Sequence, residues 1–213
     1  MVCDVKQKVS GFNALIEMYL DNSLIATAST DNNLTFGGTW KYFELDKLKY
    51  SLVWSNHVLS SNMKKKLKDK IYVKFDITDA NNEVIGSIYQ KTTDGNIFKR
   101  YEYFESDFYG TRYQLYLVPL GKLGHKYPIY KDDVQVSLIE KGNVVYNNMD
   151  EYQIYAKEFD TIEISMLLCL YLDLMVYGSL GVVVTKGFTK SYSLTTLKAL
   201  KDKYDPLFKD SVI

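Results

Sequence analysis

The side chains that most often carry catalysis or bind metals are scarce in this chain. Its 213 residues include 2 His and 2 Cys. His57 and His125 are isolated, because no HxxH or HExxH spacing and no cysteine pair completes a zinc site around either of them. Cys3 and Cys169 lie far apart in the sequence, which indicates no disulfide framework. We therefore expect no metal and no cofactor.

Motifs for nucleophilic and phosphate chemistry are also missing. The sequence has no GxSxG nucleophile elbow, no Walker-type loop and no GxGxxG. Asp132-Asp133 and Asp150-Glu151 are adjacent pairs, so on a strand the two side chains of each pair would point to opposite faces. We expect no catalytic residues and no enzyme activity. The enzymatic alternative is a barrel-end pocket in which His125 meets one of these carboxylates.

One stretch has the composition of an anion-binding surface. Residues 63–71 read MKKKLKDKI, so five lysines and one aspartate are close together. Each lysine beside an anionic membrane contributes about 1 kcal/mol of attraction. The candidate lipid-binding residues are Lys64, Lys65, Lys66, Lys68 and Lys70. The alternative is a solvated helix, or an edge strand that its lysines protect from aggregation.

Composition narrows the class of protein. Hydrophobic residues make up 46% of the chain, which is enough for a sizeable core, and 26 basic residues balance 26 acidic ones. A net charge of zero gives no reason to expect nucleic acid as a partner. The first residues, MVCDVKQKVSGFN, lack the pattern of a secretory signal, which favours a cytoplasmic protein that is at most peripheral at a membrane. No feature indicates an oligomeric state.

Short strand-like runs on either side of turn residues dominate the first two thirds of the sequence. Turns are expected at Asp21-Asn22-Ser23, at residues 80–83 and at residues 141–143, a spacing of about 60 residues that suggests repeated hairpins. The 19 Tyr and 10 Phe fit the half-buried surface of strands. These patterns predict a mainly β protein built as an antiparallel meander.

One helix interrupts the β pattern, at about residues 161–177. Asp160 and Glu163 have the spacing of an N-cap and its reciprocal partner, and Gly178 stands where a helix ends. The segment is apolar around its circumference, so it must be buried on all sides or lie in lipid. Asp173 breaks the apolar run, and a buried carboxylate there needs a partner such as a tyrosine hydroxyl. The alternatives are an exposed helix end for Asp173, or a single membrane span over residues 164–184.

The last residues predict a second, amphipathic helix. Ser193 can cap a helix with Leu194, Leu197 and Leu200 on one face, ending before Pro206. We expect residues 1–190 to form one barrel domain with a central helix. Residues 191–213 would form a helical tail packed on that domain.

The segments YVKFDITDANNEVIGSI, IEKGNVVYNN and DTIEISMLLCLYLDLMVYG together resemble the tubby C-terminal-like superfold, which includes the LURP-one-related proteins and the phospholipid scramblases. The resemblance covers about residues 49–178. It implies a closed antiparallel barrel around a hydrophobic helix, and a function in binding phosphoinositides or membranes. No phosphoinositide motif carries over residue by residue, and this chain continues past the helix, which departs from the family pattern. We therefore expect a non-enzymatic binding module whose partner is anionic phospholipid or, as the alternative, another protein in an interaction or structural role without lipid.

Overall fold

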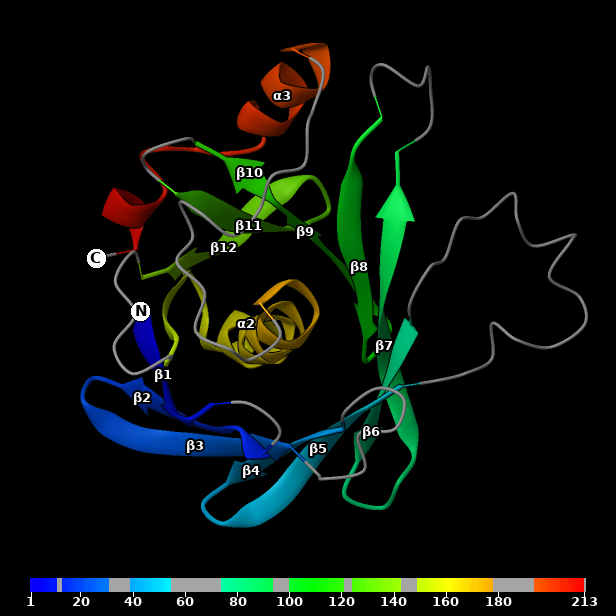
Figure 1. The fold of residues 1–213 in the computed structure, drawn as a ribbon, viewed down its shortest axis with the longest axis vertical. Helices are drawn as coiled ribbons and strands as arrows, with labels where there is room; N and C mark the ends of the chain where they lie inside the picture. Colours follow the sequence, from blue (N-terminus) through cyan, green and yellow to red (C-terminus); the bar gives the residue numbers. More distant parts are fainter. Residues whose placement is uncertain are drawn as a thin grey trace, which may run out of the picture.

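A closed antiparallel barrel makes up most of the molecule. The computed structural model describes residues 1–10, 13–30, 39–54, 74–93, 100–120, 124–142, 149–177 and 194–212. The sheet has the order β10-β11-β12-β13-β1-β2-β3-β4-β5-β6-β7-β8-β9, and β9 also pairs with β11. This last pairing closes a ring of twelve strands and leaves β10 beside it, so the predicted barrel is confirmed (Figure 1).

The strands are mostly six to nine residues long, and all their pairings are antiparallel. They are β1 (Val2–Val9), β2 (Leu15–Leu20), β3 (Ser23–Thr30), β4 (Trp40–Glu44), β5 (Lys47–Trp54), β6 (Lys74–Asp79), β7 (Val84–Thr92), β8 (Glu102–Phe108), β9 (Thr111–Tyr116), β10 (Val118–Pro119), β11 (His125–Lys131), β12 (Val134–Lys141) and β13 (Glu151–Ala156).

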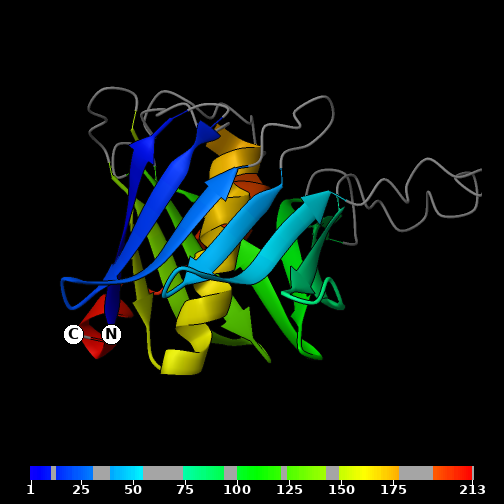
Figure 2. The same cartoon turned by 90° about the horizontal axis from the view of Figure 1, so that it is seen from below.

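Tight hairpins gather at one end of the barrel, beside the start of the central helix (Figure 2). Both central residues have positive φ in the turns Asp21-Asn22, Leu45-Asp46, Tyr109-Gly110 and Asp132-Asp133. Such turns match the twist of the strands that they join. We call this the hairpin end, and the opposite end, where the helix finishes, the far end.

The hairpin predictions are confirmed at residues 21–23 and 80–83 and wrong at Lys141, and one carboxylate pair considered as part of a strand lies in a turn. Asp132 and Asp133 form a turn rather than part of a strand, because both adopt positive φ between β11 and β12. At residues 141–143, β12 continues through Lys141 and its partner β13 begins only at Glu151, while residues 143–148 lie outside the described residues.

The central helix fills the barrel. It consists of α2 (Phe159–Leu172) and a π-helical turn, η5 (Asp173–Tyr177). Every strand of the ring sends at least one buried hydrophobic side chain into the same core as the helix. The ring of Tyr171, for example, meets Phe75 and Phe104 edge-on at centroid distances of 5.3 and 5.1 Å. Within the described ranges, every helix falls short of the length and apolar character needed to cross a bilayer.

The start of the helix differs from the prediction. Glu158, with extended backbone, is the residue before the first helical turn and makes no side-chain capping bond, so Asp160 is not the N-cap. Asp160 lies instead in the first turn, where its charge suits the helix dipole. Glu163 does not cap either, because it forms an ion pair with Lys49 on β5. Gly178 lies outside the described residues.

The C-terminal segment packs on the outside of the barrel. It contains the predicted amphipathic helix, α3 (Leu194–Lys201), and a 3-10 turn, η6 (Lys209–Ser211). Phe208 is buried against Leu138 and Tyr155, and Lys209 Nζ donates to Glu140 at 2.8 Å. The amino group of Met1 donates to the Val212 carbonyl at 3.2 Å, so the two ends of the chain lie side by side (Figure 1).

Acid should loosen this contact. Burial alone would raise the pKa of Glu140, but hydrogen bonds from Lys126 and Lys209 outweigh it and lower the pKa. A carboxylate with a lowered pKa stabilises the fold at higher pH, and that stabilisation disappears as pH falls through the folded-state pKa. We expect Glu140→Gln to lower the free energy of unfolding by about 1 kcal/mol at neutral pH.

The difference between Glu140→Gln and the parent should vanish well below pH 4.5, the ordinary carboxyl pKa. Urea unfolding at a series of pH values measures it, with the exposed Glu151→Gln as the control. A difference that stays constant into acid would contradict this assignment.

Candidate functional site

The lysine run predicted to bind lipid lies outside the described residues. Lys64, Lys65, Lys66, Lys68 and Lys70 all fall between residues 55 and 73. The strands on either side of them are described: β5 ends at Trp54 and β6 begins at Lys74, both at the far end of the barrel (Figure 2). Trp54 and Lys74, the described residues on either side of this segment, therefore lie at the end opposite the tight hairpins.

A cluster of buried polar side chains lies inside the far end of the barrel, and Asp173 belongs to it. Asp173 is fully buried in the π-helical turn, and Tyr152 Oη donates to its Oδ1 at 2.7 Å. Burial, together with the charge of Asp173, raises the pKa of Tyr152 well above its ordinary value. The carboxylate thus has a tyrosine hydroxyl as its partner, as a buried position requires.

The second part of the cluster is an ion pair that sequence reasoning missed. Lys141 Nζ and Asp150 Oδ1 pair with both side chains fully buried. The ammonium also lies 4.7 Å from the ring centroid of Tyr177 and 5.3 Å from that of Tyr152. Gln7 makes two hydrogen bonds to the backbone of Asp150. Its side-chain Oε1 accepts from the Asp150 N–H at 2.8 Å, and its backbone N–H donates to the Asp150 carbonyl at 2.9 Å.

The alternation of inward and outward residues along β12 is the sequence signal that Lys141 points into the barrel. Ser137, Ile139 and Lys141 share the inward face of the strand, and all three are buried. Because Lys141 is predicted to lie in a turn, the alternation is not extended to this residue. Asp150 and Glu151 do separate as expected, since Asp150 is buried and Glu151 is exposed.

His125 borders the cluster. It lies far from Asp132 and Asp133, one of the two carboxylate pairs considered as its catalytic partner. Its ring lies 6.3 Å from that of Tyr127, whose hydroxyl shares a hydrogen bond with the hydroxyl of Tyr177. Burial lowers the pKa of His125, which favours the neutral imidazole. Asp132 and Asp133 follow the opposite end of β11, at the hairpin end. In the parts of the chain that the structure describes, no group of three or more His, Cys, Asp or Glu could hold a metal ion.

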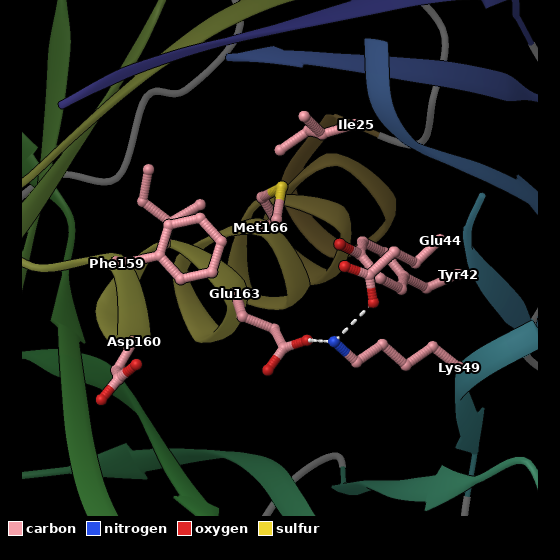
Figure 3. Close-up of a pocket in the computed structure, with 9 residues that line it drawn as sticks. Ile25, Tyr42, Glu44, Lys49, Phe159, Asp160, Glu163 and Met166 are labelled. Atoms are coloured by element: carbon pink, nitrogen blue, oxygen red, sulfur yellow. Dashed lines mark ion pairs between the residues drawn. The ribbon is translucent and has the colours of Figure 1, made fainter. Parts of the chain in front are cut away.

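A pocket of about 140 Å³ opens at the hairpin end, beside the first turns of α2 (Figure 3). Its apolar wall includes Ile25, Phe159 and Met166, and its other lining residues are Tyr42, Glu44, Lys49, Asp160, Ile162 and Glu163. Phe159 is 62% exposed at the rim. The pocket therefore combines an apolar wall with a polar rim, the usual composition of a small-ligand site.

Negative charge dominates this pocket. Lys49 Nζ lies 2.7 Å from Glu44 Oε2 and also pairs with Glu163 Oε1, so one ammonium is shared by two carboxylates (Figure 3). Burial alone would lower the pKa of Lys49, but its bonds to both carboxylates raise it. Asp160 adds a third carboxylate. The pocket suits a cation rather than an anion.

Comparison with known proteins found no matching family model, no similar curated protein and no similar solved structure. The two ends of the barrel, one with an acidic pocket and one with a buried polar cluster, are the features from which a function can be argued. The central helix occupies the space between them.

Asp173 gives a direct test of the buried cluster. Asp173→Ala should lower the free energy of unfolding by about 1–3 kcal/mol, because the Tyr152 hydroxyl loses its buried acceptor. Asp173→Lys should cost about 3–5 kcal/mol, because it buries a positive charge without a matching carboxylate. Urea denaturation measures both, and Tyr152→Phe, which removes the donor, is the matched control. Equal midpoints for the Ala and Lys variants would show that this position is not buried.

Proposed function

We propose that the chain is a non-enzymatic binding module of tubby-like architecture that associates with anionic phospholipid surfaces through Lys64, Lys65, Lys66, Lys68 and Lys70. The observation that carries the proposal is the concentration of five lysines in seven positions of a chain whose net charge is zero. The closed barrel around an apolar helix supports it, because this is the architecture that the resemblance implies.

The filled barrel also favours binding at a surface. Side chains from every strand of the ring pack against the helix, so the barrel interior serves as the protein core. A partner would then bind at an end or on the outer face. The lysine run continues from strands that reach the far end, and its attraction to lipid would be electrostatic and therefore weakened by salt.

Sedimentation with vesicles tests the proposal. The full chain should sediment with phosphatidylserine-containing vesicles at low salt and not with pure phosphatidylcholine vesicles. Reversal of all five lysines to Glu should weaken binding by more than about 100-fold, since each contributes about 1 kcal/mol.

The matched control reverses five exposed lysines elsewhere, namely Lys47, Lys131, Lys157, Lys198 and Lys201. This variant has the same net charge, so it separates a local patch from a general charge effect. Equal losses in the two variants, or no sedimentation of the parent chain, would exclude the lipid proposal.

The acidic pocket favours a second candidate function, the binding of a cationic side chain from a partner protein. Two carboxylates pair with one ammonium there, and a third, that of Asp160, also lines the pocket. Tyr42 and the exposed Phe159 add aromatic surface to the lining. Aromatic rings and carboxylates together attract alkylammonium and guanidinium groups. Lys49 occupies this position as an internal competitor.

Removal of that competitor should strengthen cation binding. Lys49→Met should bind a trilysine peptide about tenfold more tightly than the parent chain, as measured by calorimetry at low salt, because one positive charge leaves the pocket. Lys47→Met is the control, since this exposed lysine begins the same strand outside the pocket. Equal affinities for the two variants would contradict a cation site in the pocket.

A further inference from the structure

The pair formed by Lys141 and Asp150 differs from the other ion pairs of the described residues. Both of its side chains are fully buried, whereas each other pair has at least one side chain that is 19% exposed or more. Two full charges removed from water carry a desolvation penalty that their attraction repays only in part. A reaction that removes both charges would end this penalty.

The surroundings of the pair favour such a reaction. The two groups are in direct contact, and transfer of one proton from the ammonium to the carboxylate gives an amine beside a carboxylic acid, which are the forms that condense. The faces of Tyr152 and Tyr177 lie against the ammonium and shield it from solvent. Proximity of this kind replaces a bimolecular encounter by an intramolecular one.

A second carboxyl group is present in the same cluster. Tyr152 ties it to the pair, because the hydroxyl of this residue donates to Asp173 while its ring lies beside the Lys141 ammonium. Asp173 is thus linked to the pair through Tyr152, and a carboxylate in the same buried cluster is the kind of group that can carry a proton.

We propose that Lys141 and Asp150 condense in the folded protein to form an intramolecular isopeptide bond, with Asp173 as the proton carrier. The lone pair of Nζ attacks Cγ of the protonated Asp150 carboxyl group, and a C–N bond forms. The C–O bond to the hydroxyl then breaks, and the hydroxyl leaves as water with a proton that Asp173 has taken from Nζ. One ammonium and one carboxylate become one amide and one water, without oxidation or reduction.

The bond would join the last residue of β12 to the residue before β13. It would therefore close the connection between these two strands at the far end of the barrel. The amide would keep the two strand ends together when the rest of the chain opens. This inference is independent of the proposed lipid binding, because neither residue belongs to the lysine run.

Mass spectrometry of the intact, denatured chain tests the inference. The measured mass should be lower than the sequence mass by one water molecule, and proteolysis should yield a branched peptide that joins Lys141 to Asp150. Lys141→Arg keeps the positive charge but removes the nucleophilic amine, so it should have its full sequence mass. A full sequence mass for the parent chain would overturn the proposal.

Two further variants identify the reacting groups. Asp150→Asn should lose ammonia in place of water, because the leaving group changes. Loss of water that persists in Lys141→Arg would reveal a cyclised aspartate and overturn the cross-link. Asp173→Asn should accumulate the unlinked mass while circular dichroism shows the folded barrel; linkage at the parent rate would overturn the role of Asp173.

Discussion

An apolar helix without a polar face imposes the main constraint on this structure. Eleven of the fourteen residues of α2 are buried, and they lie on all sides of the helix. One sheet can cover only one side of a helix, so complete burial in water requires a sheet that curves around and closes. The pairing of β9 with β11 provides that closure. Ring size and helix must match, and inward residues as different as Ala28 and Trp40 fill the space between them.

Polar groups inside such a barrel need partners, and their placement fixes how the helix sits. The Asp173 carboxylate, in the π-helical turn, accepts from Tyr152 on β13, while Ser165, earlier on the helix, donates to Ser137 on β12 at 2.9 Å. Each bond fails if the helix slides or rotates, because the polar group would then be buried without its partner. Hydrophobic packing alone is tolerant of such shifts. The polar contacts therefore select one arrangement among several that would bury similar area.

The sequence predicts the architecture better than the chemistry, for a physical reason. Strand alternation, turn residues and an apolar helix are local patterns, and each can be recognised within a short segment without knowledge of the rest of the chain. The partners of Asp173 and Lys141 depend on how strands far apart in sequence align, and no local pattern encodes that alignment. The capping prediction at Asp160 shows the same limit: Glu163 is drawn instead to Lys49, which is distant in sequence and adjacent only in the barrel.

Acidic side chains gather at one end of the helix axis, although the chain as a whole is neutral. Asp160 and Glu163 lie in the first turns of α2, where carboxylates are favoured by the positive end of the helix dipole. The strands that flank the lysine run reach the opposite end. The filled core leaves the two ends and the outer face for recognition. Because the hairpin end is closed by short turns of fixed geometry, it can hold a preformed acidic pocket, whereas longer connections join the strands at the far end. A partner that recognises this acidic pocket would thus be oriented along the helix axis.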